Sequence, residues 1–449
     1  MADVTMEKLV SLCKRRGFIY PGSEIYGGLS GTWDYGPLGV ELKNNIKALW
    51  WKMFVQERED MYGVDAAILM NPKVWEASGH VTGFADPLVE CKKCKRRYRA
   101  DQVGDLSTPL EARKCPECGG AFGDVRQFNM MFKTQIGATP ARTTDNVQSG
   151  GDDASATTYL RPETAGGIFV NFKNVVDSFH PKLPFGIAQI GKAFRNEIAP
   201  RDFIFRVREL EQMEVEYFVY PDEWKGAFEA WRKEVYRYID AVGISKDLVH
   251  ELEVPDGERA HYSKRTIDFE FDWPFGRKEL YGLAYRTDFD LSAHAKASGA
   301  GLTMTDEEGK EPLTPHVVEP SFGVDRTILA LLISAYTEDQ LGGEPRTYLK
   351  FNPAVAPVKA AVFPLLKNKP QLVEKAREVY ALIKKAVPQT MWDDNGNIGK
   401  RYRRQDEIGT PHCITIDFQT LEDDTVTLRN RDTGEQKRIS IDELASHVA

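Results

Sequence analysis

The chain has 449 residues, of which 42% are hydrophobic and 28% charged, the balance of a soluble globular enzyme with two or three domains. Its net charge of −8 argues against nucleic-acid binding by bulk electrostatics, so any RNA contact would need a local basic patch. No apolar run approaches the roughly 18–20 residues that span a bilayer, and the N-terminal run lacks a secretion-signal pattern. We therefore expect a cytoplasmic protein without membrane contact.

The first part of the chain alternates helical and glycine-rich patterns. The run EKLVSLCKRRGF has apolar residues at helical spacing and ends at Gly17, and the following run, YPGSEIYGGLSGTWDYGPLGVEL, must form tight turns. Residues 40–62 read as an amphipathic helix with its apolar side chains on or near one side. That face fits either a subunit interface or packing within the chain.

The middle of the chain indicates a sheet with insertions. Residues from about 79 to 127 break the preceding pattern and look like an inserted module. From 128 to 208, short β-prone runs alternate with turn signals, which favours an antiparallel sheet. Residues from about 222 to 265 are helical and charged, and we expect a second insertion there. The runs IDFEFDW and ELYGLAYRTDFDL then read as strands, and FGVDRTILALLISAY as an apolar helix.

The last part of the chain has the pattern of a separate small domain. The run LGGEPRTYLKFNPAVAP, rich in proline and glycine, is the best candidate for a linker. Beyond it, short buried strands alternate with helices, as in an α/β domain. The sequence therefore predicts an α+β catalytic region over residues 1–340, with its two inserts, a linker over 341–356 and an α/β domain over 357–449.

Four of the six cysteines form two C-x2-C pairs separated by twenty residues: Cys91, Cys94, Cys115 and Cys118. In a cytoplasmic chain this spacing suggests a metal site before disulfides. Four thiolates suit a tetrahedral Zn²⁺ without an open position, so we expect a structural, zinc-ribbon-like site; four unrelated thiols are the alternative. Among the eight histidines, His80 in the SGH run is the one candidate for a functional role.

Arginines and glutamates are interleaved in the run FRNEIAPRDFIFRVRELEQMEVE, residues 194–216. Alternation along a strand places several of them on one face, where guanidinium groups could hold phosphates. Arg326 follows Gly323 near the start of a predicted helix. A single Arg–Glu pair is commonly a surface ion pair, but the ordered set within apolar strands favours a functional site.

These segments resemble class II aminoacyl-tRNA synthetases, and specifically the dimeric glycyl-tRNA synthetase family. The matching runs are PGSEIYGGLSGTWDYGPLGVELK (21–43), WEASGHVTGF (75–84), FNMMFKT (128–134), LRPETAGGIFVNF (160–172), the arginine-rich run above, EPSFGVDRTILALL (319–332) and IGKRYRRQDEIGTP (398–411). The likeness covers nearly the whole chain. Gly166 and Leu210 depart from the family pattern, where glutamine and phenylalanine are expected.

The resemblance implies a two-step reaction with ATP and Mg²⁺. The glycine carboxylate attacks the α-phosphate of ATP, and the terminal ribose of tRNA(Gly) then takes the glycyl group. Arg195 would contact the α-phosphate and the glycine carboxylate, Arg326 the γ-phosphate, and Phe205 the adenine. The other implied ATP-binding residues are Asn196, Glu197, Arg206, Val207, Arg208, Glu209, Leu210, Glu279, Leu280, Gly323, Val324 and Asp325.

Glycine offers only its ammonium, its carboxylate and its lack of bulk for recognition. The resemblance assigns the ammonium to Glu163, Glu214 and Glu319, with Ser321 against the α-carbon and Arg99 reaching in from the insert. The remaining implied glycine-binding residues are Leu210, Glu211, Gln212, Met213, Pro320, Phe322 and Gly323. Larger amino acids would be rejected by collision, so we expect no editing domain.

The resemblance also implies two partners. The C-terminal domain resembles an anticodon-binding module, and the run Lys400–Arg404 combines four cations with an aromatic ring, which suits single-stranded RNA; an ordinary solvated charge run is the alternative. In this class the helix and strand over about 40–72 form the interface of a homodimer.

Two other classes remain as alternatives. A catalytically inactive relative, such as the accessory subunit of a mitochondrial DNA polymerase, should lose the arginines and glutamates that this chain retains. A sister synthetase for proline, threonine, serine or histidine is disfavoured by the EPSFGVDR motif, the glycine-rich N-terminal run and the crowded carboxylates.

Overall fold

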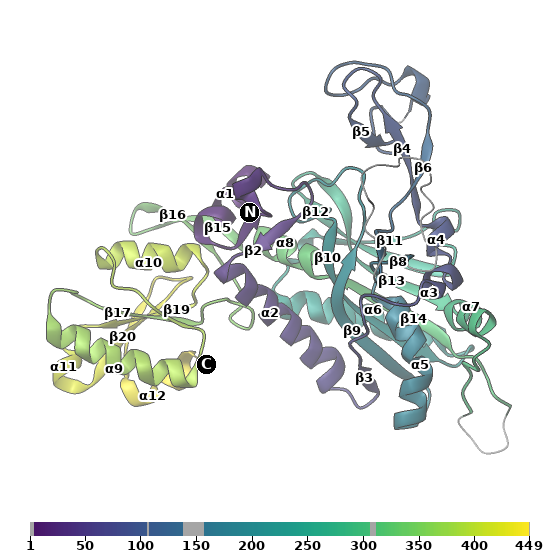
Figure 1. Ribbon diagram of the computed structural model, residues 1–449. Coiled ribbons are helices and arrows are strands. Elements are labelled where there is room, and N and C mark those ends of the chain that lie inside the picture. Colours follow the sequence, from purple (N-terminus) through teal and green to yellow (C-terminus); the bar gives the residue numbers. More distant parts are fainter. Residues whose placement is uncertain (1–3, 106, 138–156, 306–310, 449) are drawn as a thin grey trace.

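The computed structural model describes residues 4–105, 107–137, 157–305 and 311–448. A seven-stranded sheet forms the centre of the larger domain, with strand order β11–β12–β13–β14–β10–β9–β3 (Figure 1). Its strands are β3 (Met61–Gly63), β9 (Phe185–Phe194), β10 (Glu209–Val219), β11 (Val249–Glu253), β12 (Arg265–Trp273), β13 (Gly276–Thr287) and β14 (His316–Gly323). Neighbouring strands are antiparallel apart from β3 and β9. The predicted antiparallel sheet is confirmed.

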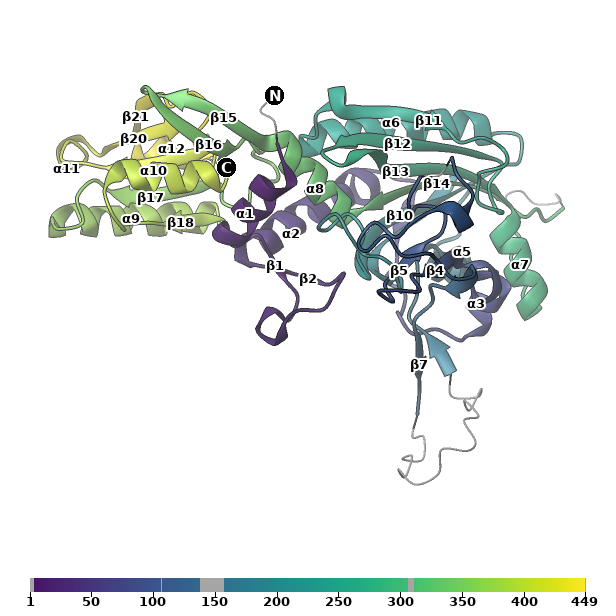
Figure 2. The same ribbon diagram turned by 90° about the horizontal axis from the view of Figure 1, so that it is seen from above.

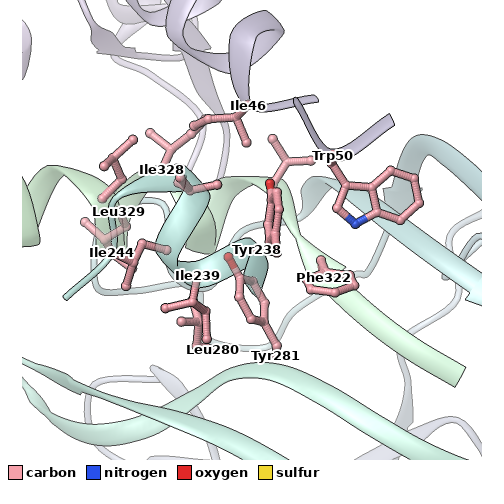
Figure 3. Close-up of a cluster of buried hydrophobic side chains, with 14 of the residues drawn as sticks. Ile46, Trp50, Tyr238, Ile239, Ile244, Leu280, Tyr281, Phe322, Ile328 and Leu329 are labelled. Atoms are coloured by element: carbon pink, nitrogen blue, oxygen red, sulfur yellow. The ribbon is translucent and has the colours of Figure 1, made fainter. Parts of the chain in front are cut away.

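Three helices cover one face of this sheet and build the main core. They are α2 (Pro37–Trp51), α6 (Trp224–Val242) and α8 (Val324–Ala335). Ile46 and Trp50 of α2 meet Tyr238 of α6 and Phe322 of β14 in the aromatic cluster of Figure 3. The apolar face of the predicted helix over 40–62 is therefore used within the chain. A π-helical turn, η2 (Lys52–Gln56), continues α2 toward β3.

The other face carries α5 (Ala165–Phe179) and α7 (Phe289–Ser298) at one end, and leaves the middle of β10, β13 and β14 uncovered. The shorter elements around it are α3 (Lys73–Ala77), α4 (His80–Gly83), β7 (Lys133–Gln135) and β8 (Thr157–Tyr159). Gly166, in the first turn of α5, lies against Trp75. A Cβ atom there would come within 2.9 Å of the indole ring, so a longer side chain would displace that ring.

The N-terminal elements are α1 (Met6–Arg16), β1 (Ile19–Pro21), η1 (Glu24–Tyr26) and β2 (Trp33–Tyr35). Gly17 ends α1 in the left-handed conformation, as the sequence pattern predicts, and Thr5 caps its first turn. The connection between β1 and β2 is the glycine-rich loop, which projects from the body in Figure 2. Its residue Gly31 packs against Pro200 and Arg208 of the arginine-rich loop.

The cysteine-containing insert is a small module of its own. Its three-stranded sheet consists of β4 (Ala85–Glu90), β5 (Arg97–Arg99) and β6 (Arg126–Asn129). The short helix η3 (Leu110–Ala112) lies between β5 and β6 in the sequence. Val89, Cys91 and Phe122 contribute to a separate small core. The module projects from the central seven-stranded sheet in Figure 1.

The second expected insert, residues 222–265, is part of the main domain. Phe228, Trp231 and Val235 of α6 are buried in the main core, and after η4 (Lys246–Leu248) the chain enters β11, the edge strand of the central sheet. The charged residues of α6 occupy the outer side of an amphipathic helix, and others lie in β11 and in the loop that lines the cleft.

The expected linker, residues 341–356, contains regular structure. Strand β16 (Glu344–Leu349) pairs with β15 (Tyr336–Leu341) in a hairpin. Arg346 is 4% exposed and bonds to Asp339 of this hairpin and Asp406 of the C-terminal domain. The hairpin and α1 lie between the two domains in Figure 2.

The C-terminal domain is a five-stranded mixed sheet of order β18–β17–β19–β20–β21. Its elements are β17 (Ala360–Pro364), α9 (Pro370–Ala386), β18 (Thr390–Trp392), α10 (Ile398–Glu407), β19 (His412–Ile416), α11 (Thr420–Asp423), β20 (Thr425–Asn430), β21 (Gln436–Ser440) and α12 (Ile441–Val448). Helices α9 and α12 pack on one face and α10 on the other (Figure 1). The predicted α/β architecture of this domain is confirmed. No helix in the described ranges is both long enough and apolar enough to cross a membrane.

Candidate active site

The uncovered face of the central sheet forms the floor of a cleft of about 460 Å³. Strands β10, β13 and β14 supply the floor, the loop over 195–208 supplies one wall, and residues 254–262 supply part of another. Arg99 enters from the cysteine-containing module. Side chains from segments far apart in the sequence therefore meet in one cavity.

Alternation along β10 points Gln212 and Glu214 into the cleft and Met213 into the core behind it. Glu214 accepts hydrogen bonds from Ser321 Oγ at 2.8 Å and Gln212 Nε2 at 2.9 Å, and also bonds to Thr164. Burial and the nearby Glu163 raise the pKa of Glu214, while its hydroxyl donors oppose the rise. Glu214 is thus a fixed acceptor at one end of the cleft.

Glu163 lies beside Glu214 and is held by His80. The two side chains approach to 3.3 Å between Nε2 and Oε2, and the other ring nitrogen of His80 is 2.8 Å from Ser78 Oγ. Burial alone would raise the pKa of Glu163, but His80, together with Arg286 and Arg195, lowers it to about 2. Glu163 is therefore a carboxylate at neutral pH, and His80 supports it.

Arg286 is a fully buried cation behind the same end of the cleft. It is the extra residue of a β-bulge between β13 and β14, which turns its side chain toward Glu319. Its guanidinium bonds to Glu319 Oε1 at 2.7 Å, forms two 2.8 Å bonds to Asp290, and lies 3.7 Å from the centre of the Tyr262 ring. Burial, Glu214 and Glu163 raise the pKa of Glu319 to about 7, against the opposing effect of Arg286.

The opposite end of the cleft combines an aromatic ring, a cation and carboxylates. Arg326 lies 4.5 Å from the centre of the Phe205 ring and forms a 2.9 Å ion pair with Glu279. Asp268 also lines this end, and burial together with Glu279 and Glu270 raises its pKa to about 7. The raised pKa marks a place with excess negative charge, where a cation would be stabilised.

Arg195 and Arg99 line the wall of the cleft. Arg195 donates from Nε to Pro162 O at 3.0 Å and lies 5.5 Å from the centre of the Phe84 ring. Arg99 is held by Asp86 and Asp101 of its own module. Both guanidinium groups are therefore oriented before a ligand arrives.

Most residues expected at the site line this one cleft. They are Arg99, Glu163, Arg195, Glu197, Phe205, Arg206, Val207, Leu210, Glu211, Gln212, Glu214, Glu279, Leu280, Glu319, Ser321, Gly323, Asp325 and Arg326.

The side chains of several other expected residues lie elsewhere. Met213 and Phe322 are buried in the main core, because they alternate along their strands with cleft-facing neighbours. Val324, the first residue of α8, is buried there too. Glu209 pairs with Lys192 at 2.6 Å on the surface. Asn196, Arg208 and Pro320 are outside the cleft lining, and Arg208 bonds to Ser30 O and Glu197 O instead.

Glu211 lines the cleft, but its carboxylate points away from it. That carboxylate pairs with Lys43 at 2.6 Å and Lys47 at 3.0 Å on α2, and its backbone N–H donates to Asp325 Oδ2. Glu211 therefore ties β10 to α2 and α8, and its side chain is not available to an amino acid in the cleft.

Arg286, Asp268 and Tyr262 are among the residues in or beside the cleft that were missed from the sequence. Arg286 stands four residues before Asp290 in the run ELYGLAYRTDFDL, which reads as a strand, and that spacing indicates a side-chain pair only within a helix. The β-bulge that positions Arg286 has no local signal. No local signal marked Asp268 or Tyr262, which reach the cleft only through the tertiary fold.

The four paired cysteines gather in one cluster within their module. The Cys91 and Cys118 sulfurs are 3.5 Å apart, the Cys94 and Cys115 sulfurs 3.7 Å, and all four lie within 4.8 Å of one another. A tetrahedral zinc–thiolate site with bonds of about 2.3 Å has sulfurs nearly 4 Å apart. The donor set and spacing fit such an ion.

The basic run of α10 divides into structural and exposed side chains. Arg401 is 1% exposed and binds the carbonyl oxygens of Pro364, Asp394 and Gly396. Tyr402 donates toward or accepts from Thr415 at 2.7 Å, and Arg404 pairs with Asp393 at 2.8 Å. Lys400 and Arg403 are exposed.

Comparison with known proteins defines the class. Residues 146–335 match the family "tRNA synthetase class II core domain (G, H, P, S and T)", and residues 359–449 match "Anticodon binding domain". The fold is similar to that of Giardia lamblia prolyl-tRNA synthetase in complex with prolyl-adenylate, with a TM-score of 0.67 and 16% identity over 98% of this chain and 77% of that chain. The fold is that of a class II aminoacyl-tRNA synthetase.

Full-length relatives identify the family within this class. The glycine–tRNA ligase of Clostridium tetani is 50% identical, covering 100% of this chain and 98% of the relative. Those of Lachnospira eligens, at 51% over 99% and 98%, and Bacillus cereus, at 50% over 98% and 97%, are similar. The chain belongs to the glycine–tRNA ligase family.

Proposed function

We propose that the chain joins glycine to tRNA(Gly) in two steps within this cleft. The observation that carries the proposal is the meeting of Glu163, Glu214 and Glu319 at one end and Phe205 and Arg326 at the other. A carboxylate oxygen of glycine attacks the α-phosphorus of ATP, and pyrophosphate leaves. The terminal ribose hydroxyl of the tRNA then attacks the glycyl carbonyl, its proton is released, and AMP leaves.

Charge binds the amino acid at the carboxylate end, and lack of space selects glycine. An ammonium group there is attracted to Glu163, Glu214 and Glu319, while Arg195 on the wall can hold the carboxylate. Ser321, fixed by its bond to Glu214, stands where a side chain on the α-carbon would need room. Bulkier amino acids would collide with this floor, which supports activity without editing.

ATP fits the aromatic end. Phe205 offers a ring for the adenine, and Arg326 offers a cation for the terminal phosphate. The 4.5 Å separation of these two side chains leaves no room for a base between them. A base that stacks on this ring would therefore require Arg326 to move away from Phe205.

Class II synthetases use ATP with Mg²⁺, and the carboxylates at this end fit that ion. Glu279 and Asp268 provide the oxygen ligands that Mg²⁺ prefers, and the raised pKa of Asp268 fits a place that lacks a positive charge. When bound, Mg²⁺ neutralises charge on the phosphate oxygens. Arg195 and Arg326 orient the same phosphates.

We also propose a structural zinc ion on Cys91, Cys94, Cys115 and Cys118. The module core is small, so four thiolates held by an ion would contribute much of its stability. The module in turn carries Arg99 to the cleft.

The proposed domain division keeps residues 1–340 as the catalytic region, 341–356 as the connection and 357–449 as the anticodon-binding domain. Within the basic run, Lys400 and Arg403 are the proposed RNA contacts, because their side chains are exposed. Arg401 instead stabilises the domain.

A homodimer through the region of residues 40–72 completes the proposal. β3 is an edge strand of only three residues, and Phe179 beside its Tyr62 is 64% exposed. Exposed aromatic surface next to an unpaired strand edge supports association there. We propose a cytoplasmic location, where ATP, glycine and tRNA are consumed together.

Aminoacylation tests the proposal directly. Purified protein with ATP, Mg²⁺ and a tRNA(Gly) transcript should transfer radiolabelled glycine into acid-precipitable RNA. The matched control is a tRNA transcript of another specificity with the same label. Equal labelling of the two RNAs, or none of either, would contradict the proposed function.

A further inference from the structure

Glu216 is a buried acidic side chain beside the carboxylate end of the cleft. It has no solvent exposure, and within the described ranges no donor forms a hydrogen bond to either of its carboxyl oxygens. An ionised carboxylate buried without donors is strongly disfavoured. A carboxylic acid that retains its proton avoids this cost.

The strand register places Glu216 opposite Glu319. The pairs Glu214–Ser321 and Tyr217–Val318 bracket these two residues on β10 and β14 in unbroken antiparallel register. Facing residues of such a pair project to the same side of the sheet, with Cβ atoms about 4.5–5.5 Å apart. Glu319 and Glu214 line the cleft, and Glu216 lies two residues beyond Glu214 along β10, on the same face of the strand.

The surrounding charges favour a neutral Glu216. Arg286 is the cation in this group, and its guanidinium is bonded to Asp290 and Glu319. Burial, Glu319, Glu214 and Asp290 raise the pKa of Glu216 well above its usual value, although Arg286 opposes them. The charged and titratable groups around this cluster are Glu163 and His80 before α5, Glu214 on β10, Tyr262 before β12, Arg286 on β13, Asp290 and His294 on α7, and Glu319 on β14.

We propose that Glu216 is a protonated positioning residue, which donates its proton toward Glu319 and holds that carboxylate in place for the ammonium group of glycine. The inference rests on the proposed glycine site. The two facing carboxyls then carry one negative charge in place of two. Glu319 keeps the charge that attracts the ammonium, and Arg286 and Glu216 fix it from two sides.

Two substitutions of Glu216 should differ in their effect, because one keeps a hydrogen-bond donor and the other removes it. Glu216→Gln keeps the shape of the side chain and supplies an N–H donor, and its amide cannot ionise. The KM for glycine in glycine-dependent ATP–pyrophosphate exchange should therefore stay within about twofold of wild type at neutral pH. Glu216→Leu removes the donor and should raise that KM at least tenfold, with the KM for ATP unchanged. An equal loss in both variants would show that Glu216 acts as an anion, and no loss in Glu216→Leu would show that no donor is needed; either result overturns the proposal.

An infrared measurement tests the proton itself, and remains decisive if Glu216→Leu does not fold. Near pH 9, where Glu319 and Asp268, each with a pKa of about 7, are ionised, the wild-type protein should still show the carbonyl stretching band of a protonated carboxylic acid, and Glu216→Gln should lack that band. If the spectra of the wild-type protein and Glu216→Gln were the same in this region, the inference would be overturned. Failure of the proposed function is distinguishable, because the wild-type protein would then show no glycine-dependent exchange at all.

Discussion

Replacing Glu163 with glutamine removes one of the three proposed ammonium partners while keeping its shape. The carboxylate is nearly buried, with 12% of the side chain exposed, and its pKa of about 2 makes it an anion throughout the working range. Two unit charges about 4 Å apart at an effective dielectric constant of roughly 20 attract by about 4 kcal/mol. The glutamine oxygen still accepts a neutral hydrogen bond, so we expect a net loss of about 1.5–3 kcal/mol. That corresponds to a rise of roughly 10–100-fold in the KM for glycine.

The assay is glycine-dependent ATP–pyrophosphate exchange, with glycine and ATP varied separately. It should be run near pH 8, because burial, Glu214 and Glu163 together raise the pKa of Glu319 to about 7, and Glu163→Gln would otherwise change the charge of that neighbour. Glu76→Gln, the same substitution at an exposed position on α3, is the matched control. An unchanged KM for glycine, or an equal rise in the KM for ATP, would refute the assignment.

Four further outcomes follow from the structure. The KM for glycine should rise as the pH falls from about 8 to about 6, because Glu319, with a pKa of about 7, gains a proton and becomes neutral; a pH-independent KM contradicts this. Arg286→Met leaves two buried carboxylates unpaired and should cost about 3–5 kcal/mol in urea unfolding, whereas a loss below about 1 kcal/mol would argue against the buried network. Cys115→Ser should abolish bound zinc in metal analysis and expose the module to proteolysis, and retained zinc would count against the site. Replacing both Lys400 and Arg403 with alanine should raise the KM for tRNA severalfold at unchanged Tm; an unaltered KM for tRNA would remove them as RNA contacts.

The central sheet could be predicted because its strands carry their pattern locally. Alternation over 209–219 separates cleft-facing glutamates from core residues, and the same rule would have placed the side chain of Met213 on the core side. The cysteine spacing likewise brought four sulfurs together as expected. Resemblance to a family supplied the order of the segments that meet in the cleft.

The rest depended on partners that are distant in sequence. Whether the helix over 224–242 is an insertion or a core element depends on what its apolar stripe contacts, and Trp231 meets Phe54 and Tyr217 only in the folded chain. The position of Arg286 depends on a β-bulge, which the local sequence does not predict. Arg401 was grouped with RNA contacts because its neighbours are basic, yet its partners are carbonyl oxygens of the preceding loop and of β17.

Amino-acid-dependent exchange of pyrophosphate into ATP tests the central claim most directly. Purified protein should support exchange with glycine, and alanine and serine should give at least a hundredfold lower kcat/KM, because their side chains meet the floor formed by Ser321 and Glu214. Exchange with alanine or serine that equals the exchange with glycine, or no exchange with glycine, would contradict the account.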